Sequence, residues 1–359
     1  MNDKHDLRMI RDRICGSLIG GAAGDALGYP VEFLMLSDIL YQYGESGITE
    51  YAPDYGKAKI SDDTQMTLFT ANGLLCAMAH GDPENAENYV YRAYRDWLYT
   101  QKGTLDPPRV SWLLDVQELF ALRAPGNTCM SALMSGKMGT PEQPLNRSKG
   151  CGGVMRVAPY GLIVRLSAEE AFAGACGAAA ITHGHRLGWL PAGMLAYIVH
   201  RLVFDGAGLR EAIADCVAYM LKRYPFDESR ELAGLTESAL KLTENDAPDT
   251  DNIRRLGEGW IGDEALAIAL YAAVKYENDF DRALICAVNH NGDSDSTGAI
   301  AGNIVGAIAG YESIAATWET ELELSGVILE LADDLFLPCS GNSTGDPDIV
   351  DAWERKYLR

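Results

Sequence analysis

The hydrophobic positions of this chain recur at the spacing of α-helices along most of its length. Apolar residues at positions 66, 69, 74, 75 and 78, for example, would share one side of a helix that begins near residue 62. Alternating apolar and polar runs, which are typical of strands, are scarce. We therefore predict an all-α fold.

Two of the predicted helices carry a stripe of glycine at four-residue spacing. The stripes are Gly16, Gly20, Gly24 and Gly28 within residues 7–28, and Gly298, Gly302, Gly306 and Gly310 near the end of the chain. Glycine in a helix interior costs up to about 1 kcal/mol relative to alanine, so each stripe indicates close packing of another backbone. We predict that the two helices pack face to face or line the same crowded centre. A pair of membrane helices is the other interpretation, which Asp25 and the lack of an apolar 20-residue run argue against.

The length and composition of the chain fit a single domain with a large core. No linker rich in proline, serine or charge divides the 359 residues, and apolar residues make up 47% of them. We therefore predict one domain over residues 1–359.

The charge and the cysteines exclude several classes of function. A formal charge of −21 argues against nucleic-acid binding, although a small phosphorylated ligand could still bind through backbone N–H groups and cations. No signal-peptide pattern and no run of 18 uncharged apolar residues appears, so we expect no membrane association. The eight cysteines form no Cys-x-x-Cys pair, which suggests neither a disulfide framework nor a zinc site and favours the cytoplasm.

The chemistry is concentrated in the stretch Asn289–Gly298, which lies between an apolar run and an Ala/Gly-rich helix. Two buried carboxylates, Asp293 and Asp295, would need a cation partner, and their oxygens suit Mg²⁺, Mn²⁺ or Ca²⁺. Capping of the helix is an equally good interpretation of this stretch alone. An EF-hand is excluded because its twelfth position would be Ile304, and a phosphatase Asp-x-Asp-x-Thr motif usually opens its domain.

A second acidic helix start distinguishes these interpretations. Ser61, Asp62 and Asp63 precede the helix near residue 62, and two adjacent acids exceed what capping requires. Together with Asp293 and Asp295 they carry four negative charges, which two divalent cations would neutralise. A two-metal site with oxygen ligands is therefore favoured.

Other polar segments are ambiguous by themselves. Pro30 should end the first helix and leave Glu32 on a flexible loop, where a solvated acid is the ordinary interpretation. Residues 84–123 predict an aromatic-rich helix whose rings belong to the core, followed by a second helical stretch, and residues 124–128 predict a turn.

Two further segments carry candidate ligand groups. The glycine-dense segment 150–156 suits a phosphate, and Cys151 within it fits a small buried thiol better than a nucleophile. His183 and His185 fit metal binding and structural roles about equally.

Taken in order, these motifs resemble those of the ADP-ribosylglycohydrolase family, of the dinitrogenase-reductase-activating and ADP-ribosyl-acceptor hydrolase type. The matching pieces span about residues 12–311; they are 20–32, 61–64, 126–128, 150–159, 182–183, 257–270 and 292–298. The resemblance implies a compact orthogonal helical bundle with a binuclear Mg²⁺ or Mn²⁺ centre in a cleft.

The resemblance also implies roles for individual residues. The implied metal ligands are Ser61, Asp62, Asp63, Asp293, Asp295 and Ser296, with Thr commoner than Ser in the family at positions 61 and 296. Glu32 matches a mobile-loop glutamate beside the metals, and Glu32, Asp62 and Asp295 are the implied catalytic acids. The implied substrate contacts are Gly126, Asn127, Thr128, Ser148, Lys149, Gly150, Cys151, Gly152 and His183.

The implied reaction is metal-dependent hydrolysis of the bond between ADP-ribose and a protein side chain, arginine by family precedent. The partners would be an ADP-ribosylated protein as substrate and ADP-ribose as product. Three alternatives stay open: a two-metal phosphohydrolase, a non-catalytic binding protein, and an immunity protein that blocks a toxin partner.

Overall fold

Helices account for all the regular structure in the computed structural model, which describes residues 3–103, 106–314, 316–338 and 347–359. No strand forms within these ranges, where only three isolated β-bridges occur, so the predicted all-α fold is confirmed. The α-helices are α1 (Asp3–Gly28), α2 (Leu36–Tyr43), α3 (Asp62–Ala79), α4 (Ala86–Lys102), α5 (Asn127–Met134), α6 (Ala168–Ala180), α7 (Arg186–His200), α8 (Leu209–Arg223), α9 (Asp227–Leu242), α10 (Asp249–Leu256), α11 (Gly262–Lys275), α12 (Phe280–Val288), α13 (Ser294–Ala309), α14 (Ala316–Thr320), α15 (Ser325–Phe336) and α16 (Pro347–Tyr357).

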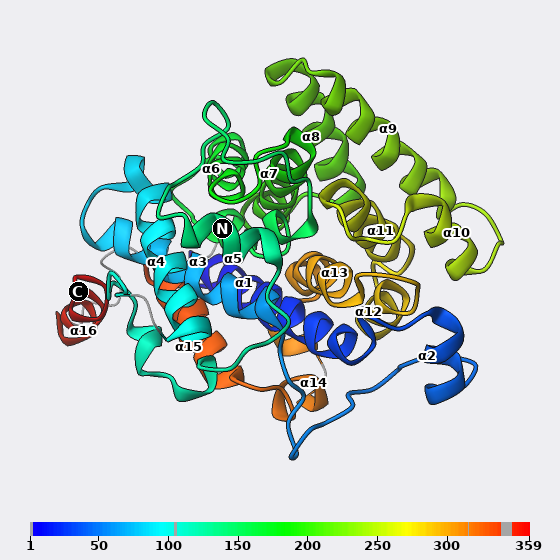
Figure 1. Cartoon of the computed structure of the whole chain (residues 1–359), viewed down its shortest axis with the longest axis horizontal. Coiled ribbons are helices and arrows are strands. Elements are labelled where there is room, and N and C mark those ends of the chain that lie inside the picture. Colours follow the sequence, from blue (N-terminus) through cyan, green and yellow to red (C-terminus); the bar gives the residue numbers. More distant parts are fainter. Residues whose placement is uncertain (1–2, 104–105, 315, 339–346) are drawn as a thin grey trace.

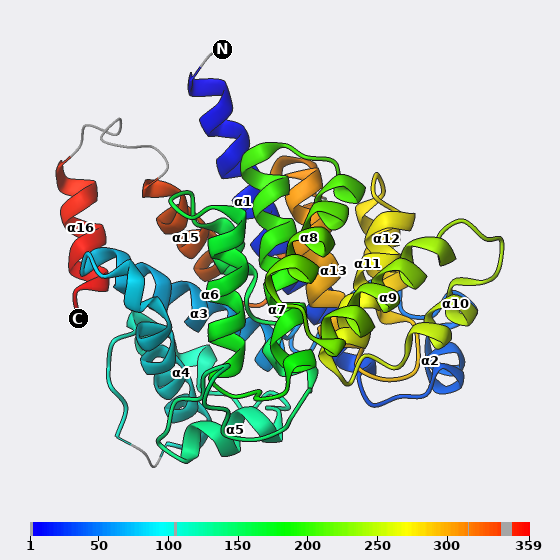
Figure 2. The same ribbon diagram turned by 90° about the horizontal axis from the view of Figure 1, so that it is seen from above.

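The antiparallel pair of α1 and α13 lies at the centre of the molecule (Figures 1 and 2). Gly20 lies against Gly302, and a Cβ atom on either residue would come closer than 3.0 Å to the other's carbonyl oxygen. The same holds for Gly24 and Gly298, so the predicted face-to-face packing is confirmed. Gly310 differs from the other glycines of its stripe, because it is the C-cap of α13 and has a φ of +74°, which favours glycine.

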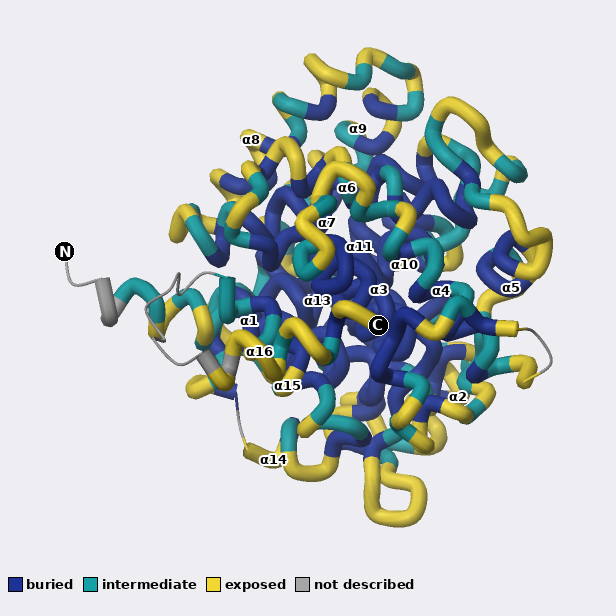
Figure 3. The backbone as a smooth tube through the Cα atoms, turned by 90° about the vertical axis from the view of Figure 1, so that its left-hand side faces the viewer, coloured by how far each residue is buried: buried dark blue, intermediate teal, exposed yellow. Residues whose placement is uncertain are grey.

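Helices α3, α7, α11, α12 and α15 pack around this pair. α3 packs against α4 and α6 against α7, while α11 and α12 pack on α13. Buried backbone is concentrated at the centre of the tube view, around α3, α11 and α13, whereas α8 and α9 carry exposed segments on the outside (Figure 3). The core is therefore continuous through the described chain, as its apolar content predicts.

The segment between α4 and α5 differs from the prediction. Instead of a second helical stretch, the described residues of this segment form only two short 3₁₀ turns, Trp112–Asp115 and Gln117–Leu119. The buried carboxylate of Asp96 accepts hydrogen bonds of 2.8–2.9 Å from three successive backbone N–H groups, at residues 109–111, and holds this segment out of a helix. Two rings of α4, Tyr94 and Trp97, are fully buried in the core, as predicted.

The predicted turn at residues 124–128 is partly wrong, because Gly126 is the N-cap of α5 and Asn127 begins that helix.

One helical stretch, Arg186–Asp205, is long and apolar enough to cross a membrane, but 89% of its apolar window is buried inside the protein, as in a core helix.

Gly302→Ala should lower the free energy of unfolding by about 1–3 kcal/mol, because the new methyl group would overlap the backbone of Gly20. Gly234→Ala is the matched control, since this exposed glycine in the interior of α9 has open space around its Cβ position. This change should raise the free energy of unfolding by roughly 0.5–1 kcal/mol. Urea denaturation followed by circular dichroism measures both changes. Equal effects at the two sites would contradict a close backbone contact.

Candidate active site

A cavity of about 890 Å³ opens where the end of α1 meets the beginnings of α3, α5 and α13. Thirteen of the sixteen residues predicted from the sequence line it: Glu32, Asp62, Asp63, Gly126, Asn127, Thr128, Gly150, Cys151, Gly152, His183, Asp293, Asp295 and Ser296. The fold thus brings residues that are far apart in sequence to the walls of one cavity.

The other three predicted residues lie behind the wall or beside it. Ser61 is fully buried as the N-cap of α3, and its hydroxyl accepts a hydrogen bond of 3.1 Å from the N–H of Asp63. The Ser148 hydroxyl lies 3.0 Å from that of Thr128, and the Lys149 carbonyl accepts a bond from the N–H of Gly262. These contacts shape the wall and leave direct ligand contact at the three positions as a prediction.

The acids at the start of α3 do more than cap the helix. Ser61 performs the capping, whereas Asp62 accepts a 3.3 Å hydrogen bond from the N–H of Gly126 across the cavity edge. One carboxylate oxygen of Asp63, Oδ2, is buried without any partner among the described residues. This acid is therefore available to an external ligand.

At the start of α13 capping and cavity lining involve the same residues. Asp293 is the N-cap, and the N–H of Ser296 donates to Asp293 at 3.3 Å and to Asp295 at 2.9 Å. The preceding Gly292 has a φ of +110°, and a Cβ there would overlap the carbonyl of Glu258. The two interpretations of this stretch are thus compatible.

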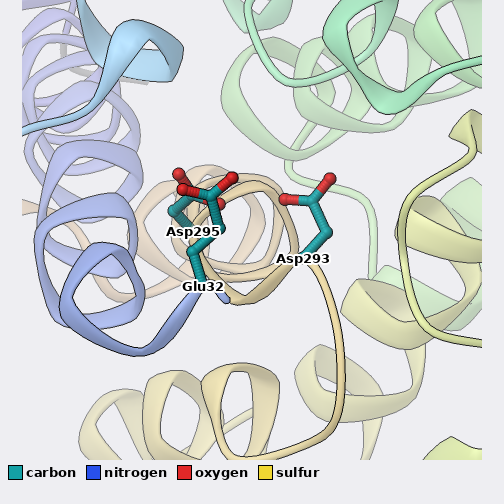
Figure 4. A group of neighbouring side chains, drawn as sticks. All are labelled: Glu32, Asp293 and Asp295. Atoms are coloured by element: carbon teal, nitrogen blue, oxygen red, sulfur yellow. The ribbon is translucent and has the colours of Figure 1, made fainter. Parts of the chain in front are cut away.

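Glu32 is not the solvated loop acid that its local sequence suggests. After α1 the chain makes a 3₁₀ turn, Tyr29–Val31, with Pro30 inside it, and Glu32 ends this turn with only 7% exposure. Its carboxylate faces those of Asp293 and Asp295 (Figure 4), and oxygen atoms of all three lie within 4.8 Å of one another. The position beside the predicted metal ligands agrees with the family resemblance.

The electrostatics of this cluster are unfavourable without a cation. Burial, followed by the charges of Asp293 and Asp62, raises the pKa of Glu32 to about 9, and burial also raises the pKa of Asp62 well above its ordinary value. Lys59 and Arg123, the cations nearest in sequence to the start of α3 and to Gly126, both pair with Glu323 instead. Unpartnered carboxylate oxygens in an all-oxygen donor set fit a hard divalent cation such as Mg²⁺ or Mn²⁺.

Asp25 is a polar residue of the site that the sequence did not single out. It is fully buried in α1 and accepts hydrogen bonds from the N–H of Ser61 at 3.0 Å and of Thr64 at 3.1 Å, and from the Thr64 hydroxyl. Burial raises its pKa to about 6 against the lowering effect of these bonds. In the sequence, Asp25 is distinguished only as a single acid between Gly24 and Gly28 of the glycine stripe.

The opposite wall contains the glycine turn and His183. Burial, and then the charge of Arg156, lowers the pKa of His183 to about 3, so its ring is neutral. His185 caps α7 by accepting a bond from the N–H of Leu187, which gives it a structural role. Cys151 is half-buried and donates its thiol proton to Asp293 at 2.6 Å, while burial raises its pKa, so it does not act as a nucleophile.

The sequence also did not predict an aromatic pair at the mouth of the cavity. Phe33, from the turn after α1, stacks on Trp260, from the loop before α11, with ring centroids 5.8 Å apart. Phe33 is 72% exposed, and Leu122 and Met134 add exposed apolar surface on the same lining. The mouth is therefore apolar while the floor is acidic.

An all-helical protein with an acid-floored cavity and a glycine turn matches one class of hydrolase. The chain belongs to the ADP-ribosylglycohydrolase family, whose sequence model matches residues 6–345. It is 26% identical over 331 residues to the ADP-ribosyl-[dinitrogen reductase] glycohydrolase of Rhodospirillum rubrum, covering 88% of this chain and 92% of that protein. It is also 26% identical over 333 residues to the ADP-ribosylarginine hydrolase Tri1 of Pseudomonas putida, covering 90% of this chain and 78% of that protein.

The fold is also found among solved structures. An ADP-ribosylglycohydrolase-related protein complex superimposes with a TM-score of 0.59 and 24% sequence identity, over 92% of this chain and 98% of that one. The likeness confirms the predicted architecture.

The metal-free protein should lose stability as pH rises, because burial and neighbouring acids raise the pKa of Glu32 from 4.5 to about 9. Between these values the folded protein binds more protons than the unfolded chain, so the free energy of unfolding falls with pH. Urea denaturation in chelator from pH 5 to 9 measures the slope. Glu32→Gln should make it shallower, whereas Glu84→Gln, at an exposed acid, should leave it unchanged; equal slopes in all three proteins would contradict the argument.

Proposed function

We propose that this protein hydrolyses the bond between C1″ of ADP-ribose and a protein side chain, and so reverses mono-ADP-ribosylation. The observation that carries the proposal is the floor of the cavity, where oxygen atoms of the buried acids Glu32, Asp293 and Asp295 lie within 4.8 Å of one another. Membership of the ADP-ribosylglycohydrolase family supports the reaction class.

We propose two Mg²⁺ or Mn²⁺ ions as cofactors. The residues that would hold them are Ser61, Asp62, Asp63, Asp293, Asp295 and Ser296. Their four carboxylates would balance two divalent charges, and the unpartnered Oδ2 of Asp63 supports this assignment. When bound, such ions supply Lewis acidity and lower the pKa of a water molecule.

The acids of the floor would carry out the proton transfers. Glu32 lines the cavity with a carboxylate oxygen within 4.8 Å of those of Asp293 and Asp295, a position from which it can exchange a proton with a water molecule held by the other acids. Asp62 and Asp295, buried beside Glu32, would orient the attacking water and the ribose whose bond to the leaving group is cleaved.

The opposite wall would hold the rest of ADP-ribose. The backbone N–H of Gly152 and those at the start of α5 would bind the diphosphate, whereas the N–H groups of Gly150 and Cys151 already donate to Ser148 and Trp260. Binding through backbone donors suits a protein whose net charge of −21 repels anions. The neutral His183 offers a ring nitrogen on the same wall. The apolar mouth at Phe33 and Trp260 would then face the modified protein.

We propose arginine as the acceptor residue. The similarity to a relative named ADP-ribosylarginine hydrolase supports this choice, and an acidic protein should associate faster with a guanidinium group and its basic surroundings at low salt. A cytoplasmic location accords with the seven described cysteines, all of which are free.

Removal of metal should abolish turnover, and Mg²⁺ or Mn²⁺ should restore it. Asp62→Ala/Asp63→Ala and Asp293→Ala/Asp295→Ala should have the same effect while the chain stays folded, because these acids repel one another without a cation. Label release from ADP-ribosylated protein and circular dichroism test activity and folding separately. Full activity in excess chelator would overturn the two-metal site.

ADP-ribosyl-arginine should be cleaved faster than ADP-ribosyl-serine. The measurement incubates both modified proteins side by side with Mg²⁺ and identifies the released product. Preferential cleavage of the serine linkage would overturn the acceptor assignment alone. Release of phosphate instead of ADP-ribose would indicate a phosphohydrolase, and tight binding without turnover would indicate a binding or immunity protein.

A further inference from the structure

A fully buried arginine lies behind the glycine turn without a carboxylate partner among the described residues. Arg156 follows the turn and is 0% exposed. A buried guanidinium usually pairs with an acid, since an unpaired buried charge is costly. Contacts other than an ion pair must therefore stabilise this guanidinium.

The guanidinium is fixed by contacts on several sides. Nη2 donates to the Thr182 hydroxyl at 2.8 Å and to the Ala178 carbonyl at 3.2 Å. Nη1 donates to the Cys129 sulfur at 3.1 Å, and the Tyr94 ring stacks against the group with its centroid 4.4 Å from Cζ. Arg156 therefore presents a stationary positive charge to Thr182.

Thr182 connects this charge to His183. The Thr182 hydroxyl oxygen lies 2.9 Å from Nδ1 of His183 and already accepts the bond from Arg156. A proton on Nδ1 would direct a second donor towards the same oxygen and towards the guanidinium. Among the described residues, the Thr182 hydroxyl proton would then be left with the thiol of Cys129, which is a weak acceptor.

The opposite tautomer satisfies all these groups. With a lone pair on Nδ1, the Thr182 hydroxyl accepts from Arg156 and donates to His183, and the single ring proton is on Nε2. No described residue bonds to Nε2, and His183 lines the cavity. A Cβ atom on Gly150 would lie 3.3 Å from Nε2, and one on Gly152 3.1 Å from Cε1, so the ring edge rests against the glycine turn.

We propose that Arg156 and Thr182 are positioning residues that fix His183 as a neutral Nε2–H donor beside the glycine turn. The ligand it serves is an oxygen of ADP-ribose, a part of the inference that rests on the proposed function. A neutral donor suits this place, because burial and the charge of Arg156 both disfavour a charged histidine.

The tautomer can be measured without substrate or metal. Nitrogen-15 NMR of histidine-labelled protein, with the His183 signals assigned from His183→Gln, should show a pyrrole-type Nε2 and a pyridine-type Nδ1. Thr182→Val should mix the two tautomers, and Thr182→Ser should preserve the wild-type pattern. A pyridine-type Nε2 in the wild type, or an unchanged pattern in Thr182→Val, would overturn the proposal even if Arg156 variants fail to fold.

Binding of ADP-ribose, measured by titration calorimetry in Mg²⁺, tests the use of this donor. Thr182→Val should weaken binding about tenfold relative to Thr182→Ser, which corresponds to about 1.4 kcal/mol. Thr236→Val is the matched control, because the buried Thr236 hydroxyl donates to the Leu232 carbonyl within α9 and lies outside the cavity lining, so this change should leave the affinity unchanged. Equal affinity in Thr182→Val would overturn the donor role, whereas absence of binding by the wild type would overturn the proposed function and leave the NMR result to decide the tautomer.

Discussion

The contact between the backbones of α1 and α13 determines where the groups of the site lie. At the C-terminal end of α1, Gly28 lies so close to Ser294 that a Cβ atom on Gly28 would overlap the peptide bond between Ser294 and Asp295. The turn after Gly28 therefore delivers Glu32 next to the first residues of α13. Larger side chains would move the helices apart and, with them, two sets of carboxylates.

α1 also controls the start of α3, through one residue. Asp25 accepts hydrogen bonds from backbone N–H groups at the beginning of that helix and so holds Ser61 and the two acids after it. Each helix N-terminus can stabilise about one carboxylate through its free N–H groups and dipole. Two starts with two acids each exceed this capacity, and the excess charge is the physical basis for the proposed cations.

The sequence predicts the helices well because their periodicity is local, and it predicts the central pair because only glycine permits that approach. It identifies Asp62, Asp63, Asp293 and Asp295 because adjacent acids at helix starts are unusual. It fails for Glu32, whose burial depends on how α1 docks on α13, and only the family resemblance indicated that Glu32 lies beside the other acids. Asp25, the Phe33–Trp260 pair and the loss of the helix after α4 were missed because each depends on contacts between segments whose proximity no local pattern encodes.

The pairing of α1 with α13 has a consequence for how the protein folds. The two helices lie near opposite ends of the matched region, so α1 is synthesised long before the surface that covers its glycine face exists. Contacts between such distant segments form slowly, and the unpaired face stays open to unwanted association until then. Because Glu32 comes from one end and Asp293 and Asp295 from the other, no shorter folding unit contains the acidic cluster of the cavity floor. The same contact between α1 and α13 therefore completes both the core and the acidic floor of the cavity.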